Sequence, residues 1–239
     1  GIEVDVVELA QRIMARVVSP LISAHFLARH EIAGCRIHCG RSVEGIEAVD
    51  GRLQGVVLDD GRRLAADLVV VGIGVVPNVE LALDAGLPSR QGIVVDEYLA
   101  TADPHISAIG DCALFSSPRY EAPVRLESVA NATDQAKCLA ARLTGNPAPF
   151  DAVPWFWSDQ GKDKLQIAGF IDRVDEAVVR GEAGENSFSV FCYSDGRLLG
   201  VESVNRAGDH MAARRLLAAG ACVRPDQAAD LSFNLKGAL

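Results

Sequence analysis

The segment TADPHISAIGD, residues 101–111, ends a short apolar stretch on a glycine and a carboxylate. Its apolar residues Ile106, Ala108 and Ile109 predict a buried strand. Because Gly110 allows close approach of the backbone, we expect Asp111 at the carboxyl end of that strand, where open α/β sheets hold their ligands. A carboxylate there can accept hydrogen bonds from ribityl or ribose hydroxyls. A plain strand followed by an Asp turn explains the same residues without a ligand.

A second carboxylate, Glu8, ends the segment VDVVE, residues 4–8, which predicts a strand. In dinucleotide-binding folds an acidic side chain at the end of the second strand hydrogen-bonds the ribose hydroxyls of adenosine. Such a carboxylate favours NADH over NADPH because a 2'-phosphate would meet like charge, which Arg12 or Arg16 would partly offset. A solvated cap at the strand end is the alternative for Glu8.

Composition limits the class of protein. The 239 residues are 49% hydrophobic with a mean hydropathy of +0.16, enough for a sizeable core and more than one folding unit. No apolar run reaches the length of about 18 residues that a membrane helix needs, and no signal segment opens the chain, so we expect a cytoplasmic protein. The net charge of −9 argues against binding to nucleic acid or to an anionic membrane.

Six cysteines are scattered through the chain without a CxxC pair, which indicates reduced and mostly buried thiols. Cys35, His38 and Cys39 are close enough in sequence to raise the question of a metal site. Their segment predicts a strand, however, and alternate side chains of a strand face opposite ways. We therefore expect no metal site.

Turn and capping residues divide the rest of the chain into elements. A helix is expected from Leu21 to Ala33, after Ser19 and Pro20, and a second one begins at Ser128 as N-cap and ends before Gly145. From its sequence alone, Val129 in that second helix is expected to be a core residue. The remaining predictions are an antiparallel meander (43–49 and 53–58), a fully buried central strand (68–73), a helix (79–85), a strand (93–95), C-terminal strands (165–168, 177–180, 188–193, 198–204) and a last helix (209–219).

Taken together, these residues resemble the FAD-dependent, NADH-linked ferredoxin and rubredoxin reductases of bacterial oxygenase systems, a branch of the pyridine nucleotide-disulfide reductase superfamily. The resemblance covers nearly the whole chain. It is carried by VDVVE (4–8), VGIGVVPN (71–78), TADPHISAIGD (101–111), RLESVANATDQA (125–136) and WFWSDQ (155–160). It implies an α/β fold: remnants of Rossmann-like NAD- and FAD-binding domains in residues 1–74 and 75–150, then a C-terminal α+β reductase domain in residues 151–239.

The resemblance also implies roles for particular residues. Asp111 would contact the ribityl and pyrophosphate part of FAD, and Val129 would lie at a helix start that faces the isoalloxazine. Trp155 and Trp157, both tryptophans of the chain, would lie close to the isoalloxazine and to the docking surface of an iron-sulfur partner. A core cluster at a domain interface is the equal alternative for the tryptophans.

The reaction implied is electron transfer from NADH through FAD to a ferredoxin, so the flavin carries the chemistry and no nucleophile or general base is required. Small ferredoxins are usually acidic, and the reductase should therefore present a local basic surface. The candidates for this surface are Lys162, Lys164, Arg206, Arg214 and Arg215.

One departure from the family pattern matters: neither of its two GxGxxG phosphate loops is present. We therefore expect a C-terminal fragment that binds FAD and NADH poorly or not at all and is catalytically silent by itself. A disulfide reductase of the glutathione reductase type is disfavoured because no glutamate follows His210. A nitrite-reductase-like or apoptosis-inducing-factor-like flavoprotein and a non-catalytic dimerisation or interaction domain stay open, as does a homodimer.

Overall fold

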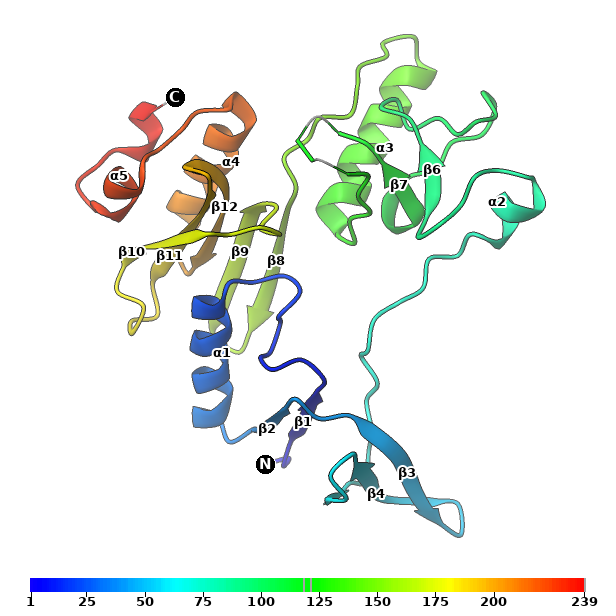
Figure 1. The fold of residues 1–239 in the computed structure, drawn as a ribbon, viewed down its shortest axis with the longest axis vertical. Helices are drawn as coiled ribbons and strands as arrows, with labels where there is room; N and C mark the ends of the chain where they lie inside the picture. Colours follow the sequence, from blue (N-terminus) through cyan, green and yellow to red (C-terminus); the bar gives the residue numbers. More distant parts are fainter. Residues whose placement is uncertain (118, 121, 239) are drawn as a thin grey trace.

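Four sheets carry the α/β fold in the computed structural model, which describes residues 1–117, 119–120 and 122–238. A two-stranded parallel pair and a three-stranded antiparallel sheet lie in the first third of the chain, at the bottom of Figure 1. A second parallel pair lies in the middle third, and a five-stranded antiparallel sheet in the last. This arrangement confirms the α/β fold class.

The first parallel pair forms a strand–helix–strand unit, as predicted. β1 (Asp5–Glu8) pairs with β2 (Arg36–Cys39) through α1 (Pro20–Ile32). Ser19 caps α1, because its Oγ accepts the amide of Ile22 at 3.4 Å. Gly34 follows the helix with φ of 93°, a backbone conformation that glycine adopts at low cost.

The meander is also confirmed. It consists of β3 (Val43–Val49), β4 (Arg52–Leu58) and β5 (Arg63–Ala65), which pair antiparallel in that order. Asp50 and Gly51 join β3 to β4 with φ of 49° and 75°. Positive φ at both central residues is the geometry of a tight hairpin turn.

The segment 68–73 is not the buried central strand that its apolar residues predict. It has no strand assignment, and Val70 and Ile73 are 85% and 91% exposed. Figure 1 shows it as part of the extended connection from the meander to α2 (Glu80–Asp84). An apolar run becomes a central strand only where neighbouring strands supply backbone partners, and no strand of the described residues pairs with this one.

The middle third packs one helix against the second parallel pair. Its elements are β6 (Ile93–Val95), the 3-10 turn η1 (Gly110–Cys112), β7 (Ala113–Phe115) and α3 (Val129–Leu143). Phe115 and Phe150 meet edge to face in its core, with ring centroids 5.2 Å apart. The predicted helix 79–85, the strand 93–95 and the Ser128 helix are all confirmed.

The five-stranded sheet is buried on both faces. Its strands are β8 (Trp155–Gln160), β9 (Asp163–Gly169), β10 (Glu176–Gly181), β11 (Phe188–Ser194) and β12 (Arg197–Val204), in the order β10-β11-β12-β9-β8. Strand β8 was not among the predicted strands. Along β11, Phe188 and Val190 pack into one core, whereas Phe191 and Tyr193 pack into the other, as alternate side chains of a strand must.

Two helices from distant parts of the chain cover these faces. Helix α4 (Ala207–Ala219) covers one face through Ala213 and Leu216, together with α5 (Pro225–Ala229) and the 3-10 turn η2 (Leu235–Ala238). Helix α1 covers the other face through Ile22 and Phe26. Figure 1 shows α1 lying beside the sheet. The domain boundaries near residues 74 and 150 stay predictions, but α1 shares its core with the last third of the chain.

A buried arginine holds the C-terminal segment to this sheet. Arg180 on β10 is 5% exposed. Its guanidinium donates to the carbonyls of Ala228, Asp230, Leu231 and Phe233 at 2.5 to 3.3 Å. One planar side chain therefore donates to four backbone carbonyls of the segment, of which that of Asp230 also accepts the amide of Phe233.

We predict that Arg180→Met lowers the free energy of unfolding by about 3 kcal/mol, because it leaves buried carbonyls without donors. Urea denaturation followed by circular dichroism measures this change. Arg197→Met is the matched control, since Arg197 is exposed and no ion pair is found for it among the described residues. Equal stability of the two variants would contradict the prediction.

Candidate cofactor site

Asp111 lies in the turn η1, ahead of strand β7, and not behind a strand as its sequence predicts. Residues 106–109 make only an isolated bridge, from Ala100 to Ser107, and Ile106 is 38% exposed. The reason is local. Asp103 accepts the amide of His105 at 2.8 Å, and the amide of Ile106 donates to the Asp103 carbonyl. This Asx turn uses the backbone groups that a strand ladder would need.

The backbone that carries Asp111 is clamped from two sides. The amide of Gly110 donates to Gln135 Oε1 at 2.6 Å, and Arg125 Nη1 donates to the Asp111 carbonyl at 2.9 Å. Arg125 is itself fixed by Glu127 at 2.6 Å. The Asp111 side chain is exposed and makes no hydrogen bond among the described residues, so its carboxylate stays available as an acceptor. Gln135 and Arg125 were not among the predicted site residues, although both lie in the RLESVANATDQA motif.

The start of α3 lies against this turn. Ser128 caps the helix, because its Oγ accepts the amide of Asn131 at 3.0 Å, and the first amides of a helix have no partner within it. Val129 occupies the first helical position and is 68% exposed. The expectation of a core position for Val129 is therefore wrong. The buried face of this first turn begins at Ala130 and Asn131.

Trp155 and Trp157 form one aromatic stack. They lie two residues apart on β8, hence on the same face, with ring centroids 5.5 Å apart and planes at 28°. The Arg214 guanidinium of α4 lies 4.3 Å from the Trp155 ring centroid, within cation–π range. His210, 1% exposed, completes the cluster. Burial, with the nearby Arg214 charge, lowers the pKa of His210 to about 4, so its imidazole is neutral at pH 7.

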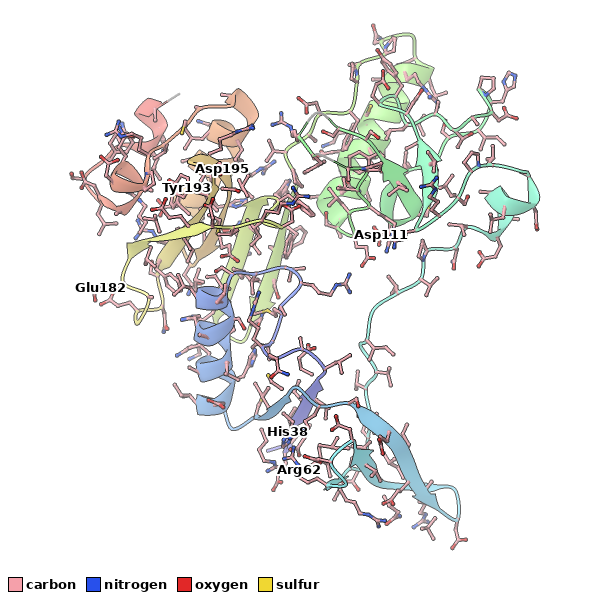
Figure 2. All side chains as sticks on the ribbon, viewed as in Figure 1. His38, Arg62, Asp111, Glu182, Tyr193 and Asp195 are labelled. Atoms are coloured by element: carbon pink, nitrogen blue, oxygen red, sulfur yellow. The ribbon has the colours of Figure 1, made fainter. Side chains whose placement is uncertain are left out.

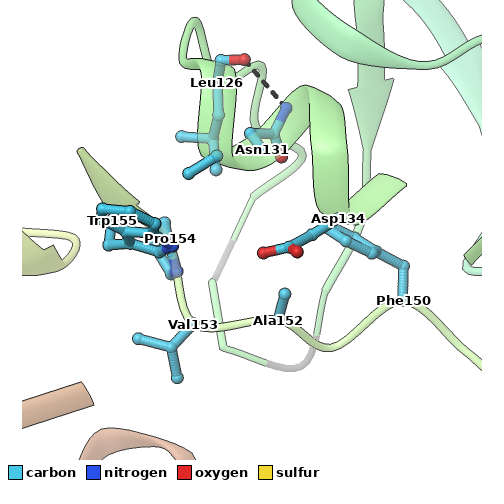
Figure 3. Close-up of a pocket in the computed structure, with 9 residues that line it drawn as sticks. Leu126, Asn131, Asp134, Phe150, Ala152, Val153, Pro154 and Trp155 are labelled. Atoms are coloured by element: carbon cyan, nitrogen blue, oxygen red, sulfur yellow. Dashed lines mark hydrogen bonds between the residues drawn. The ribbon is translucent and has the colours of Figure 1, made fainter. Parts of the chain in front are cut away.

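A small pocket separates Trp155 from α3, as Figure 3 shows. Leu126, Asn131 and Asp134 line it on one side, and residues 152–154, in the linker between α3 and β8, line the other. The Asn131 amide group donates to the Leu126 carbonyl at 3.0 Å, whereas its Oδ1 is buried without a partner. Helix α3, which begins at Val129, thus contacts both the turn that carries Asp111 and the strand that carries the tryptophan stack.

Glu8 lies elsewhere. Its strand β1 belongs to the lower part of Figure 1, remote from α3. Figure 2 makes the same separation visible through Asp111 and His38, whose strand β2 pairs with β1. One carboxylate oxygen of Glu8 accepts the amide of Ala10 at 2.8 Å, which is the capping role that the sequence left open. The other oxygen has no partner among the described residues and can accept a hydroxyl.

Of the two arginines near Glu8, Arg12 is already used by the loop. Its guanidinium donates to the carbonyls of Ala15 and Val18 at 3.0 and 2.8 Å. Arg16 is exposed. If the 2'-phosphate of NADPH were present, Arg16 and not Arg12 would therefore be the arginine available to offset its negative charge.

Strand β1 also carries a charged cluster. Asp5 accepts hydrogen bonds from Arg36 at 2.7 and 2.9 Å and pairs with His38 Nε2 at 2.8 Å. The Arg36 hydrogen bonds, above all, lower the pKa of Asp5 to about 2. The described residues contain no group of three or more His, Cys, Asp or Glu side chains that could hold a metal ion. His38 is instead engaged by a carboxylate.

Among the basic candidates for a docking surface, several are already paired. Lys164 lies 3.5 Å from Asp159, and Arg206 lies 2.6 Å from Asp209. Arg214 is the candidate that meets the tryptophan stack. Lys162 and Arg215 are exposed.

Comparison with known proteins decides the family. The model of the pyridine nucleotide-disulphide oxidoreductase family matches residues 1–136, and a reductase C-terminal model matches residues 155–239. The chain belongs to the pyridine nucleotide-disulphide oxidoreductase family. This finding confirms the resemblance recognised in the sequence motifs.

Relatives of this chain include proteins named rhodocoxin reductase and putidaredoxin reductase. Rhodocoxin reductase of Rhodococcus erythropolis is 52% identical over 239 residues, which are 100% of this chain and 56% of that protein. Putidaredoxin reductase of Pseudomonas putida is 40% identical over 238 residues, 99% of this chain and 56% of that protein. The chain thus spans a little more than half the length of these relatives.

Solved structures agree with this family assignment. The ferredoxin reductase for the CYP199A2 system of Rhodopseudomonas palustris matches with a TM-score of 0.98 and 60% identity, over 100% of this chain and 59% of that one. The covalent complex of putidaredoxin reductase with putidaredoxin matches with a TM-score of 0.96 and 40% identity, over 100% of this chain and 58% of that one.

Among the described residues, no helix has both the length and the apolar character for crossing a membrane.

The residues around Asp111 fit the dinucleotide chemistry of this oxidoreductase family. They offer an unpaired carboxylate on a fixed backbone and a helix start with free amides, which suit hydroxyl groups and a negative ring edge respectively. Gly92 packs against the turn η1, because a Cβ atom at position 92 would come within 2.9 Å of the Cys112 carbonyl oxygen. The turn therefore packs as closely as backbone allows.

We predict that Gln135→Leu loosens the turn that carries Asp111, because the buried Gly110 amide loses its acceptor at a cost of about 1–3 kcal/mol. Amide hydrogen exchange, read by NMR, should show Gly110 exchanging about tenfold faster or more. Gln54→Leu makes the same chemical change at an exposed position of β4 and should leave Gly110 unchanged. Unaltered exchange in Gln135→Leu would refute the clamp.

The Asp5 cluster predicts a pH dependence of stability. The pKa of Asp5 is lower in the folded chain than in the unfolded chain. Its contribution to the free energy of unfolding is therefore fully present above about pH 4 and is lost as the pH falls through about 2. We expect Asp5→Asn to be less stable than the parent chain by about 1–2 kcal/mol at pH 7, allowing for the half-exposed Arg36. The difference should vanish near pH 2 in urea denaturation, and Asp67→Asn, an exposed control, should show none.

Proposed function

We propose that this chain is the C-terminal part of a flavoprotein reductase that passes electrons from NADH through FAD to a ferredoxin. The observation that supports it best is the convergence of three features: the unpaired Asp111 carboxylate, the free start of α3 and the tryptophan stack. FAD, when bound, accepts two electrons from NADH and releases them one at a time. The protein would supply binding, orientation and electrostatics.

Asp111 would accept hydrogen bonds from the ribityl hydroxyls of FAD next to its pyrophosphate. Gln135 and Arg125 hold the backbone of this turn in place. Val129, exposed at the first position of α3, would face the isoalloxazine. The helix start would stabilise negative charge on the reduced ring, because its free amides and positive dipole end point that way. Trp155 and Trp157 would cover the ring and exclude water from it.

Glu8 would bind the adenosine ribose of NADH through its free carboxylate oxygen and would disfavour a 2'-phosphate. The ferredoxin would dock near Trp157, which is 41% exposed, with Arg214 and the nearby basic side chains facing its acidic surface. The named relatives favour a ferredoxin-type carrier over a nitrite-reductase-like or apoptosis-inducing-factor-like role, and over a non-catalytic interaction domain. A cytoplasmic location agrees with the six free cysteines.

The test uses a chimera in which the unmatched part of rhodocoxin reductase is fused ahead of Gly1 of this chain. The 52% identity of the matched parts makes such a fusion reasonable. The chimera should purify with bound flavin, be bleached by NADH without oxygen and reduce a ferredoxin. The 239-residue chain alone should hold no stoichiometric flavin. A yellow chain alone, or a folded chimera without flavin, would contradict the proposal.

A single substitution in the chimera sharpens the assignment. Asp111→Ala should weaken FAD binding by about 10- to 100-fold, since a hydrogen bond to a charged group contributes about 1.5–3 kcal/mol. Fluorescence titration of the deflavinated protein measures this. Asp84→Ala, at the exposed end of α2, is the control and should bind FAD like the unchanged chimera.

A further inference from the structure

The interface between α1 and the five-stranded sheet has polar contacts as well as an apolar core. Arg29 Nε lies 2.8 Å from Asp163 Oδ2, and His30 Nε2 lies 2.8 Å from Gln160 Oε1. Both contacts join α1 to the β8–β9 hairpin. At the other end of α1, the contact is made by a single carboxylate from the middle of the sheet.

That carboxylate belongs to Glu202, which is 0% exposed on β12. Its Oε1 accepts the amide of Ser19 at 2.8 Å. The Cys192 thiol lies 3.7 Å from Oε2. Ser19 is the N-cap of α1, so the carboxylate lies at the positive end of the helix dipole. Burial nevertheless raises the pKa of Glu202, because hydrogen bonding from Ser19 and the nearby Arg12 charge offset desolvation only in part.

The loop 9–18 runs from Glu8 to Ser19 and is held on the same face. Ser23 Oγ donates to the Ile13 carbonyl at 2.7 Å, and Gln160 Nε2 lies 3.2 Å from Met14 Sδ. Ile13 and Val18 pack into the core between α1 and the sheet. The loop therefore rests on the last third of the chain at one end and on strand β1 at the other.

We propose that Glu202 is a positioning residue for the nucleotide end of the site: it fixes Ser19, and with it the loop that sets the conformation of Glu8. The proposal rests on the proposed role of Glu8 in binding ribose. A leucine at position 202 would fill the same core but would leave the Ser19 amide without an acceptor. The Glu202 carboxylate thus positions the loop 9–18, whereas an apolar side chain at position 202 would only fill the core.

Hydrogen exchange of the 239-residue chain, read by mass spectrometry at pH 7, tests the proposal without any coenzyme. In Glu202→Leu the amides of residues 9–23, including Ala10, which donates to Glu8, should exchange about tenfold faster or more, a factor that corresponds to one buried hydrogen bond. Glu202→Gln should restore protection to the parent level, because its amide oxygen can still accept from Ser19. If Glu202→Leu does not fold, Glu202→Asp takes its place, since the shorter side chain withdraws the acceptor.

Arg180→Met is the matched control, because it weakens the same sheet at the other side. It should raise exchange in residues 225–238 and leave residues 9–23 protected. Parent-like protection of 9–23 in Glu202→Leu would overturn the proposal, and so would an equal rise in 9–23 for Arg180→Met or a failure of Glu202→Gln to rescue. Since no coenzyme is present, these outcomes are independent of the flavin and NADH readouts of the chimera.

Discussion

The five-stranded sheet needs cover on both of its faces, and the rest of the arrangement follows from that requirement. Strand β11, which lies between the edge strand β10 and the central strand β12, sends Phe188 and Phe191 to opposite sides, and each is fully buried. Burial of one such side chain is worth about 2 kcal/mol. Helix α4, adjacent in sequence, can cover only one face, so α1 from the first part of the chain must cover the other. The sheet thereby fixes where the strand bearing Glu8 can lie.

The same sheet orients the candidate flavin-facing surface. Strand β8 forms one edge of it and begins with Trp155, directly after the linker from α3. The pocket between Trp155 and Asn131 lies at the interface, or seam, between the sheet and the middle third of the chain. Arg119 bridges these two parts near this seam, since it donates to the Leu217 carbonyl and pairs with Asp151. An arginine at the end of α4 also suits the negative end of that helix.

Helix caps and tight turns could be predicted from the sequence, whereas strand pairing could not. Ser19 with Pro20, Ser128 and the Asp50–Gly51 turn act within a few residues, so their elements could be predicted. The strand at 68–73 failed because a strand depends on partners elsewhere. The strand before Asp111 and the burial of Val129 failed for local reasons instead, since the Asx turn at Asp103 and the place of Val129 at the start of α3 decided them. The role of Gln135 could not be predicted, because it depends on a hydrogen bond to the Gly110 amide, which lies 25 residues away in the sequence.

The open segment 69–76, VVVGIGVV, has a consequence for how the isolated chain behaves in solution. It carries no charge, it is rich in β-branched residues, and most of its side chains face solvent. Stretches of this kind are the ones that join chain to chain in cross-β aggregates. Asp67 and Pro77 stand at its two ends, where a charge and a proline act as gatekeepers against such pairing. The colloidal stability of this chain therefore depends on a stretch that contributes little to its folded core.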